Sequence, residues 1–449
     1  MKTNSDEMHN QEMLLKKIRQ SSEVFDKLAN SYEVWVPESG WLAGRRNRDK
    51  NDSKRKYLDD WTMLSFVFEI DNCHYPMADS YLQYGIDGVI RIAAETLETL
   101  QNNLQSKLQD QTQLDIAYLE SLLHVWKRFR QFVADHMVLA LESAKQETSD
   151  TKKKRYEKIA KICQNLTINK PNTFCEALQL FWFTYLFRSP FGAGCIGRLD
   201  QLLYPFYKHD CEMGIWDQQE AEKMLEEMFT RMNEINTGDT LRNLMLSGQD
   251  AKGNDQTNEI TYLILVAYEN TGGSEPHLNV RFHEKTPKKL RDNCINMLSS
   301  GSGQPTIYFD EAVLPAMEKA GICHEDACQY ANDGCTETVI AGKSAIVFWQ
   351  YEMVKTVELT LFGGNENPCV KPVSMKKNSI HGADFVPKTN LLIGIESKKP
   401  QELTTFSEFL SAFFEQMDHQ LDHYFLMIKQ KMQEDQTVSI TSPFTAGTF

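Results

Sequence analysis

The stretch YANDGCTETVIAGKS occupies residues 330–344 and places a thiol, Cys335, two residues before a carboxylate, Glu337. Gly334 precedes the cysteine, and the apolar run 345–349 follows the stretch. We recognise neither a helix cap nor a hairpin signal here, and we expect a loop. If its backbone is extended, side chains two residues apart point to the same side. A thiol can be a nucleophile, a metal ligand or a radical carrier, and a neighbouring carboxylate can take a proton or hold a cation.

Simpler interpretations of the same residues stay open. A buried cysteine beside a surface glutamate is the commoner meaning of Cys-x-Glu alone. Cys323, His324, Cys328 and Cys335 fall within thirteen residues, but structural zinc sites usually pair cysteines more closely and add a second pair. A thiol hydrolase needs a histidine oriented by a third group, and none of the eleven histidines has a recognisable local signature. The pattern therefore does not favour a bound metal or a hydrolase.

Composition limits the class of protein. The chain has 449 residues, 41% hydrophobic, with 48 basic and 62 acidic residues and a net charge of −14. This acidity argues against a nucleic-acid surface, which needs a basic face. No segment approaches the ~18 consecutive apolar residues of a membrane span, and the polar N-terminus does not resemble a signal peptide. We expect a cytoplasmic protein whose ten cysteines are reduced thiols.

Hydrophobic periodicity predicts helices alternating with short strands. Helical spacing covers residues 1–30, 88–144, 171–186, 220–236 and 402–432. Residues 149–158 are a charged link or a helix start. Short apolar runs suited to strands are 260–267, 278–282, 306–309 and 346–348. The alternation predicts a parallel α/β architecture, in which catalytic residues gather at strand ends.

Seven motifs occur in the order that they have in one known family. They are WLAGR (41–45), HYPMADSYLQYGIDG (74–88), TFCEALQLFWF (173–183), GRLDQLLYPFYKHD (197–210), LNVRFHEKTP (278–287), GSGQPTIYFDEAV (301–313) and the Gly-Cys-x-Glu loop. With them the chain resembles the glycyl radical enzymes, the pyruvate formate-lyase-like superfamily, from about residue 30 to residue 449. The resemblance implies the N-terminal part of a ten-stranded barrel, an α/β half-barrel wrapped by many helices.

The resemblance also implies roles for single residues. Cys335 matches the cysteine that becomes a transient thiyl radical, and Glu337 matches the general base of the eliminating members. His74 is a candidate substrate-binding residue, and a structural role is the alternative. Arg198 and Asp200 are expected to hold the fold as ion-pair residues rather than to act in catalysis. The cysteine stands alone in its loop, which disfavours acyl transfer from pyruvate and points to the lyase and dehydratase branch.

Two departures from the family bear on the substrate. Some dehydratases carry a His-Ser pair where this chain has Gly192-Ala193, and a polar residue where it has residues 347–349, which are apolar. A glycerol or diol pocket is therefore not expected. The sequence favours a more apolar or bulkier molecule, still a small hydroxylated or amino substrate.

The family stores its radical on a glycine in an Arg-Val-x-Gly-Tyr motif, and the sequence contains no such motif. We therefore expect residues 1–449 to be a pyruvate formate-lyase-like domain that is incomplete at its C-terminus, without the glycine radical domain. A separate chain would supply the glycyl radical in trans, after activation by a radical S-adenosylmethionine enzyme, in anaerobic cytoplasm. The chain itself would hold no cofactor. An inert truncated paralogue, or a binding or regulatory protein that keeps the fold, are the alternatives.

Overall fold

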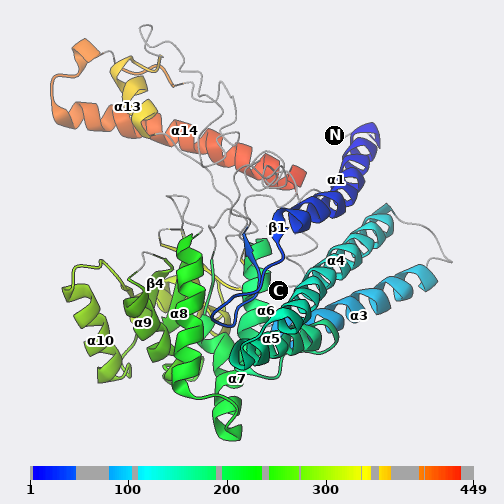
Figure 1. Cartoon of the computed structure of the whole chain (residues 1–449). Helices are drawn as coiled ribbons and strands as arrows, with labels where there is room; N and C mark the ends of the chain where they lie inside the picture. The colour runs from blue at the N-terminus through cyan, green and yellow to red at the C-terminus, as the bar shows by residue number, and fades with distance from the viewer. Residues whose placement is uncertain are drawn as a thin grey trace. The chain divides into compact units, whose positions relative to one another are not determined.

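The computed structural model describes residues 4–46, 80–103, 110–188, 195–234, 242–272, 275–334, 336–344, 353–365, 394–398 and 400–435. Figure 1 shows the whole chain, whose ends are marked. It divides into two compact units, Met1–Ile346 with Thr441–Phe449, and Val347–Ile440.

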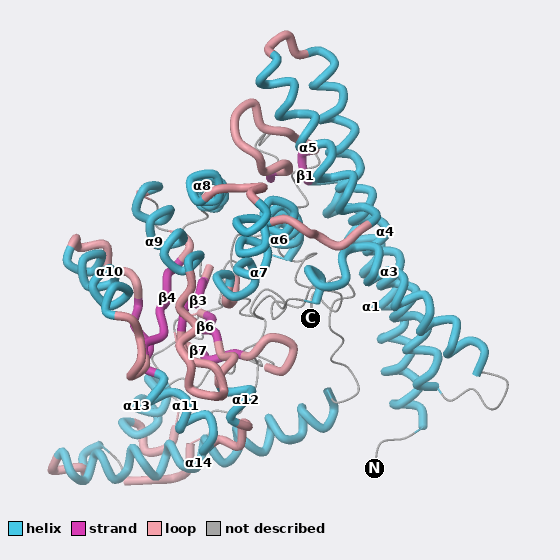
Figure 2. The backbone as a smooth tube through the Cα atoms, turned by 90° about the horizontal axis from the view of Figure 1, so that it is seen from below, coloured by secondary structure: helices cyan, strands magenta, loops and turns pink. Residues whose placement is uncertain are grey.

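Long helices form one part of the first unit. Helix α4 (Asp110–Gln146) packs against α1 (Asn4–Ser31), α3 (Ser80–Asn103) and α5 (Asp150–Ile168), and α3, α4 and α5 lie side by side in both views (Figures 1 and 2). The helices predicted over residues 1–30 and 88–144 are confirmed for 4–30, 88–103 and 110–144, and the remaining positions lie outside the described residues. The charged stretch 149–158 begins α5, with Ser149 as its N-cap residue.

A parallel sheet forms the other part of this unit. Strands β3 (Asn243–Ser247), β4 (His277–Phe282) and β5 (Thr306–Phe309) pair in that order, all parallel. Helices α9 (Glu259–Thr271) and α10 (Lys288–Ser299) connect them, and Gly197, just before α7 (Leu199–Met213), pairs in parallel with Leu244 of β3. The predicted α/β architecture is confirmed, including the strands expected at 278–282 and 306–309. Strand β3 was not predicted, and residues 346–348 lie outside the described residues.

The strand predicted over residues 260–267 is wrong, because these residues form α9. Asn258 caps this helix: its side chain accepts a hydrogen bond from the backbone N–H of Thr261, and the Thr261 hydroxyl accepts one from the N–H of Asn258. The helix is buried on most of its surface. Its sequence therefore lacks the polar positions, repeated at helical spacing, that mark an amphipathic helix. A continuous apolar run of this length fits a buried strand equally well.

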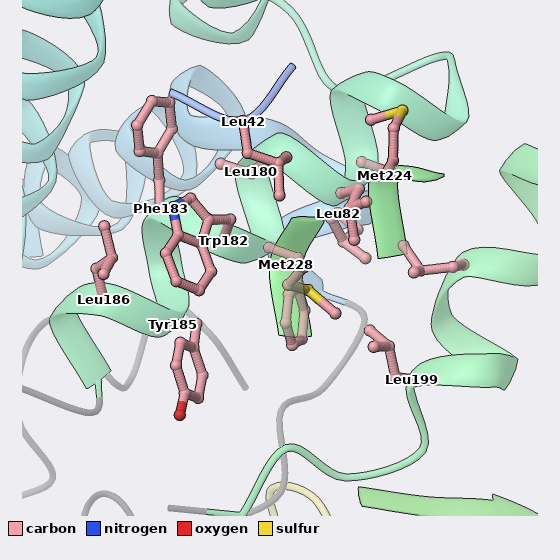
Figure 3. Close-up of a cluster of buried hydrophobic side chains, with 14 of the residues drawn as sticks. Leu42, Leu82, Leu180, Trp182, Phe183, Tyr185, Leu186, Leu199, Met224 and Met228 are labelled. Atoms are coloured by element: carbon pink, nitrogen blue, oxygen red, sulfur yellow. The ribbon is translucent and has the colours of Figure 1, made fainter. Parts of the chain in front are cut away.

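Two helices contribute to the hydrophobic core that packs against one face of the sheet. Helix α6 (Phe174–Arg188) is buried from end to end, which is why it is apolar on all sides. Helix α8 (Gln218–Glu234) contributes Met224 and Met228 to the same cluster (Figure 3). Strand side chains alternate between faces, so Leu244 of β3 joins this core while Asn243 points to the opposite face.

The WLAGR motif is held by the helix of another motif. The Gln179 side chain donates to the carbonyl of Ala43 at 3.0 Å and accepts from its N–H at 2.7 Å, and Trp182 Nε1 donates to the Gly44 carbonyl at 2.9 Å. Gly44 has φ +86°, and a Cβ there would lie 2.7 Å from the Phe183 ring. Only glycine suits this position, which links strands β1 (Tyr32–Glu33) and β2 (Arg45–Arg46) to α6.

The second unit contains α13 (Met353–Leu361), the short 3-10 helix η4 (Pro400–Glu402) and α14 (Phe406–Asp435). Helix α14 confirms the helix predicted over 402–432. Its Gln420 side chain accepts a hydrogen bond from the Thr356 hydroxyl of α13 at 2.8 Å. Buried side-chain hydrogen bonds of this kind fix the pairing of the two helices.

Candidate active site

Residues 331–339 form a β-hairpin, and the loop without hairpin expected from the sequence is wrong. Strands β6 (Ala331–Asp333) and β7 (Glu337–Val339) are antiparallel, with Asp333 opposite Glu337. Gly334 has φ +52°, which gives the left-handed residue that three-residue hairpin turns commonly need. The strands are joined through Gly334 and Thr336, and Cys335, which lies between these two in the sequence, is outside the described residues.

The Glu337 carboxylate lies over this turn. Its Oε2 accepts a hydrogen bond from the Thr336 N–H at 3.0 Å, and a Cβ on Gly334 would lie 2.5 Å from the same oxygen. Glycine before the cysteine therefore makes room for the carboxylate. Cys335 and His74, the other two predicted site residues, lie outside the described residues, so only Glu337 is placed.

Side chains from distant strands hold the hairpin. Asn243 of β3 donates to the Gly334 carbonyl at 2.9 Å and accepts from Asn332 Nδ2 at 2.9 Å. Cys195 Sγ donates to the Asn332 carbonyl at 3.0 Å. Sequence analysis missed Asn243 and Cys195, because no local pattern shows that they face a segment some 90 or more positions away.

A buried ionic cluster fixes the start of the hairpin. Arg281 of β4 forms a bidentate pair with Asp310, the first residue of α11 (Asp310–Lys319), with both distances 2.8 Å and both side chains fully buried. Arg281 also donates to the Cys328 carbonyl at 2.9 Å and lies 4.0 Å from the Tyr330 ring centre. The Tyr330 hydroxyl donates to Asp310 at 2.9 Å, and burial raises the pKa of Tyr330. The cluster ties the carboxyl end of β4 to the hairpin.

Arg198 and Asp200 both bind the backbone of Ser247 at the end of β3, as residues that hold the fold do. The Ser247 N–H donates to Asp200 at 2.8 Å, and its carbonyl accepts from Arg198 at 2.9 Å. Ser247 has φ +62°, a conformation that costs a non-glycine residue about 1–2 kcal/mol. Burial lowers the pKa of Arg198 to about 10 and raises that of Asp200. Both charges thus hold this backbone turn, and each also favours the charged form of the other.

A cavity of about 660 Å³ lies between helix α7 and the base of the hairpin. Leu202 and Phe206 of α7, Ala331 and Ile340 belong to its lining, and Glu337 does not. Its volume is in the range of small-molecule sites. The carboxylate at the turn and this cavity are therefore separate features of the first unit.

The cysteines near the hairpin form no metal site within the described part of the chain, where no three His, Cys, Asp or Glu side chains converge as ligands. His324 is the first residue of helix α12 (His324–Ala327). Its Nδ1 lies 2.6 Å from the Glu318 carboxylate oxygen Oε1, and its Nε2 lies 3.6 Å from Cys328 Sγ. Sequence analysis did not find this chain of three groups. The thiol is fully buried, and burial raises the pKa of Cys328, which opposes a nucleophilic role.

Comparison with known proteins places this hairpin in a family. The model of the pyruvate formate lyase-like family matches residues 70–439. This chain belongs to the pyruvate formate lyase-like family. The resemblance drawn from the seven motifs is confirmed, and the relatives of this family member are glycyl radical enzymes of the lyase and dehydratase branch.

Trans-4-hydroxy-L-proline dehydratase of Clostridioides difficile is 31% identical over 301 residues, 63% of this chain and 36% of that protein. A crystal structure of hydroxyproline dehydratase from the same species, with trans-4-hydroxy-L-proline bound, is 26% identical, with a TM-score of 0.69 over 84% of this chain and 47% of that one. A structure described for 1,2-propanediol dehydration in Roseburia inulinivorans has a TM-score of 0.73 at 18% identity, over 97% of this chain and 60% of that one, and supports the fold alone.

This member of the pyruvate formate lyase-like family spans about a third of the length of the curated relatives that it matches. It covers 36%, 34% and 36% of the length of three of them. The fold prediction is confirmed as α/β with many helices, like the glycyl radical enzyme structures. Among the described helices none is long and apolar enough to cross a membrane.

Proposed function

We propose that this chain is the hairpin-bearing part of a glycyl radical lyase or dehydratase, which breaks a carbon–heteroatom bond in a small hydroxylated or amino substrate. The observation that supports the proposal best is the hairpin itself. The Glu337 carboxylate lies over the turn between its two strands, where the sequence places Cys335, and buried contacts to β3 and β4 anchor the hairpin.

The proposed reaction divides between two side chains. Cys335, as a thiyl radical, takes a hydrogen atom from the substrate carbon that bears a hydroxyl or amino group. Glu337 takes a proton from that group, and the leaving group departs from the adjacent carbon with its bonding electron pair. The product radical then takes the hydrogen atom back from the Cys335 thiol. Both groups act on one small molecule and must lie within a few ångströms of it.

For the substrate we propose a chemical class. His74 is proposed to contact it, and the apolar residues 347–349 favour a substrate bulkier than glycerol. The relative at 31% identity is named for trans-4-hydroxy-L-proline, which combines a hydroxyl group with a ring. A cyclic or otherwise bulky hydroxylated amino acid is therefore our first candidate.

The proposal needs a radical source, because side-chain acid–base groups do not supply unpaired electrons. A glycyl radical would supply the one-electron oxidation of Cys335, carried by a separate C-terminal chain and formed by a radical S-adenosylmethionine activating enzyme. Such radicals are sensitive to oxygen, so we propose that the protein works in anaerobic cytoplasm. One relative is itself named as a glycyl radical subunit, that of 4-hydroxyphenylacetate decarboxylase.

The test begins with the DNA that follows codon 449, read for a frame that encodes an Arg-Val-x-Gly-Tyr motif. That product, the present chain and a radical S-adenosylmethionine activase are then produced together without oxygen. We expect an electron paramagnetic resonance signal of a glycyl radical and conversion of trans-4-hydroxy-L-proline, isethionate or a diol from a panel.

Two variants assign the roles. Cys335→Ala should abolish turnover, and full activity in that variant would refute the proposal. Glu337→Gln should block elimination while the substrate still loses deuterium from its reacting carbon, because hydrogen abstraction does not need the base. If no frame or other chain of the genome encodes the motif, and no radical forms, the inert paralogue or the binding protein becomes the better description.

A further inference from the structure

We infer that Asn243, the first residue of β3, is the positioning residue that sets where the hairpin turn lies. The inference rests on the proposed function, because it concerns the placement of Cys335 and Glu337. Asn243 is 2% exposed, and it would act through the turn rather than touch the reacting atoms.

Side chains rather than a strand ladder attach the hairpin. Strands β6 and β7 pair with each other, and β3, β4 and β5 form a separate sheet, so in the described residues no backbone ladder joins the two. A ladder would fix the register of a strand at every second residue. Here the register of β6 against β3 depends on individual side-chain hydrogen bonds.

Asn243 makes the hydrogen bond nearest to the turn. Its Nδ2 donates to the Gly334 carbonyl at 2.9 Å, while its Oδ1 accepts from Asn332 Nδ2 at 2.9 Å and from Asn279 Nδ2 of β4 at 3.3 Å. Asn332 and Asn279 are 1% and 3% exposed. One amide group therefore joins β3 and β4 to the middle of β6 and to the residue that follows this strand.

The bond to Gly334 acts on the peptide unit that leads into Cys335. The carbonyl carbon of Gly334 is bonded to the nitrogen of the next residue, and their peptide unit is planar. A hydrogen bond to the Gly334 oxygen therefore restrains the rotation of that peptide unit just before the proposed radical residue. Hydrogen-atom transfer needs close approach, and a displacement of 1 Å can reduce a rate about 100-fold.

The test replaces the donor and keeps the shape. Asn243→Asp retains the oxygen that accepts from Asn332 and Asn279 but, when ionised, cannot donate to Gly334. Asn243→Ser adds no charge and is too short to reach the carbonyl, so it is the second variant if the first does not fold. Asn296→Asp, on the exposed face of α10, is the matched control.

Hydrogen exchange of the full chain, read by mass spectrometry on peptides that cover 331–339, is the first measurement. We expect exchange about tenfold faster in a folded Asn243 variant, with helix α4 unchanged and the control like the wild type. Exchange equal to that of the control would overturn the inference. This measurement needs no turnover, so it is independent of the proposed function.

The second measurement is made in the reconstituted enzyme, if that complex turns over. A positioning role predicts that kcat falls about tenfold or more while KM changes little. A fall in melting temperature with kcat retained would show an ordinary structural residue and would overturn the inference.

Discussion

Replacement of Gly334 by alanine tests how the turn accommodates the Glu337 carboxylate. Gly334 has φ +52°, and an alanine held in the left-handed region costs about 1–2 kcal/mol. The new Cβ would also lie 2.5 Å from Glu337 Oε2 and 3.0 Å from its Cδ. Ordinary contact distances require the carboxylate to retreat by about 1 Å.

The two effects are separable. The backbone strain lowers the free energy of unfolding, because alanine in the folded chain is held at a left-handed φ that it disfavours. The contact with the carboxylate costs little stability, since the end of a flexible side chain can move, but it displaces the proposed base. A 1 Å displacement predicts a loss of elimination rate of about 100-fold.

Gly253→Ala is the matched control, because Gly253 has φ +71° but nothing nearer than 3.8 Å to an added Cβ. Urea denaturation should show a similar loss of stability in both variants, of about 1–2 kcal/mol. Only Gly334→Ala should lose elimination activity in the reconstituted enzyme. If Gly334→Ala keeps full activity, the placement of Glu337 over the turn is not the one used in catalysis.

Three further changes address the scaffold. Arg281→Met should lower the free energy of unfolding by about 3–5 kcal/mol, because it leaves Asp310 buried without its partner. Urea denaturation should show a smaller loss when Asp310→Leu is added to this variant. If the losses of the two substitutions add, the two side chains do not stabilise each other. Gly44→Ala should cost about 1–3 kcal/mol through its φ of +86° and the contact with Phe183, and a melting temperature equal to that of the wild type would exclude this packing. Burial lowers the pKa of His136 to about 4, whereas an unfolded histidine titrates near about 6.5. The unfolded chain therefore binds the proton first, and stability falls by about 3 kcal/mol as the pH drops from about 6.5 to 4; His136→Phe should flatten this slope in denaturation curves at pH 4.5 and 7.5, and an unchanged slope would assign it to other groups.

The sequence predicts the parts of the fold that depend on local pattern. Helix α6 is predictable because its apolar run is too long for a typical strand. Strands β4 and β5 are predictable because their apolar runs are as short as typical strands. Helix α9 was mistaken for a strand, since burial on most of its surface removes the periodicity that separates the two.

The site was predicted less completely than the fold. Glu337 was found because it stands beside a cysteine in a motif, and the structure places its carboxylate at the turn. Asn243 and Arg281 could not be found in this way. Their partners, Gly334 and Asp310, lie 91 and 29 positions away, and only the folded chain brings them together.

The attachment of the hairpin by side chains has a consequence for how such proteins diversify. A strand inside a ladder can hardly change its path without disturbing its neighbours, whereas a hairpin held at a few points can exchange the residues between those points. Substitutions at Thr336 or Thr338 leave the contacts of Asn243 and Arg281 intact. Under the proposed function, a short segment could change the substrate preference while strands β3, β4 and β5 stay as they are, so the hairpin is the region to vary in a library.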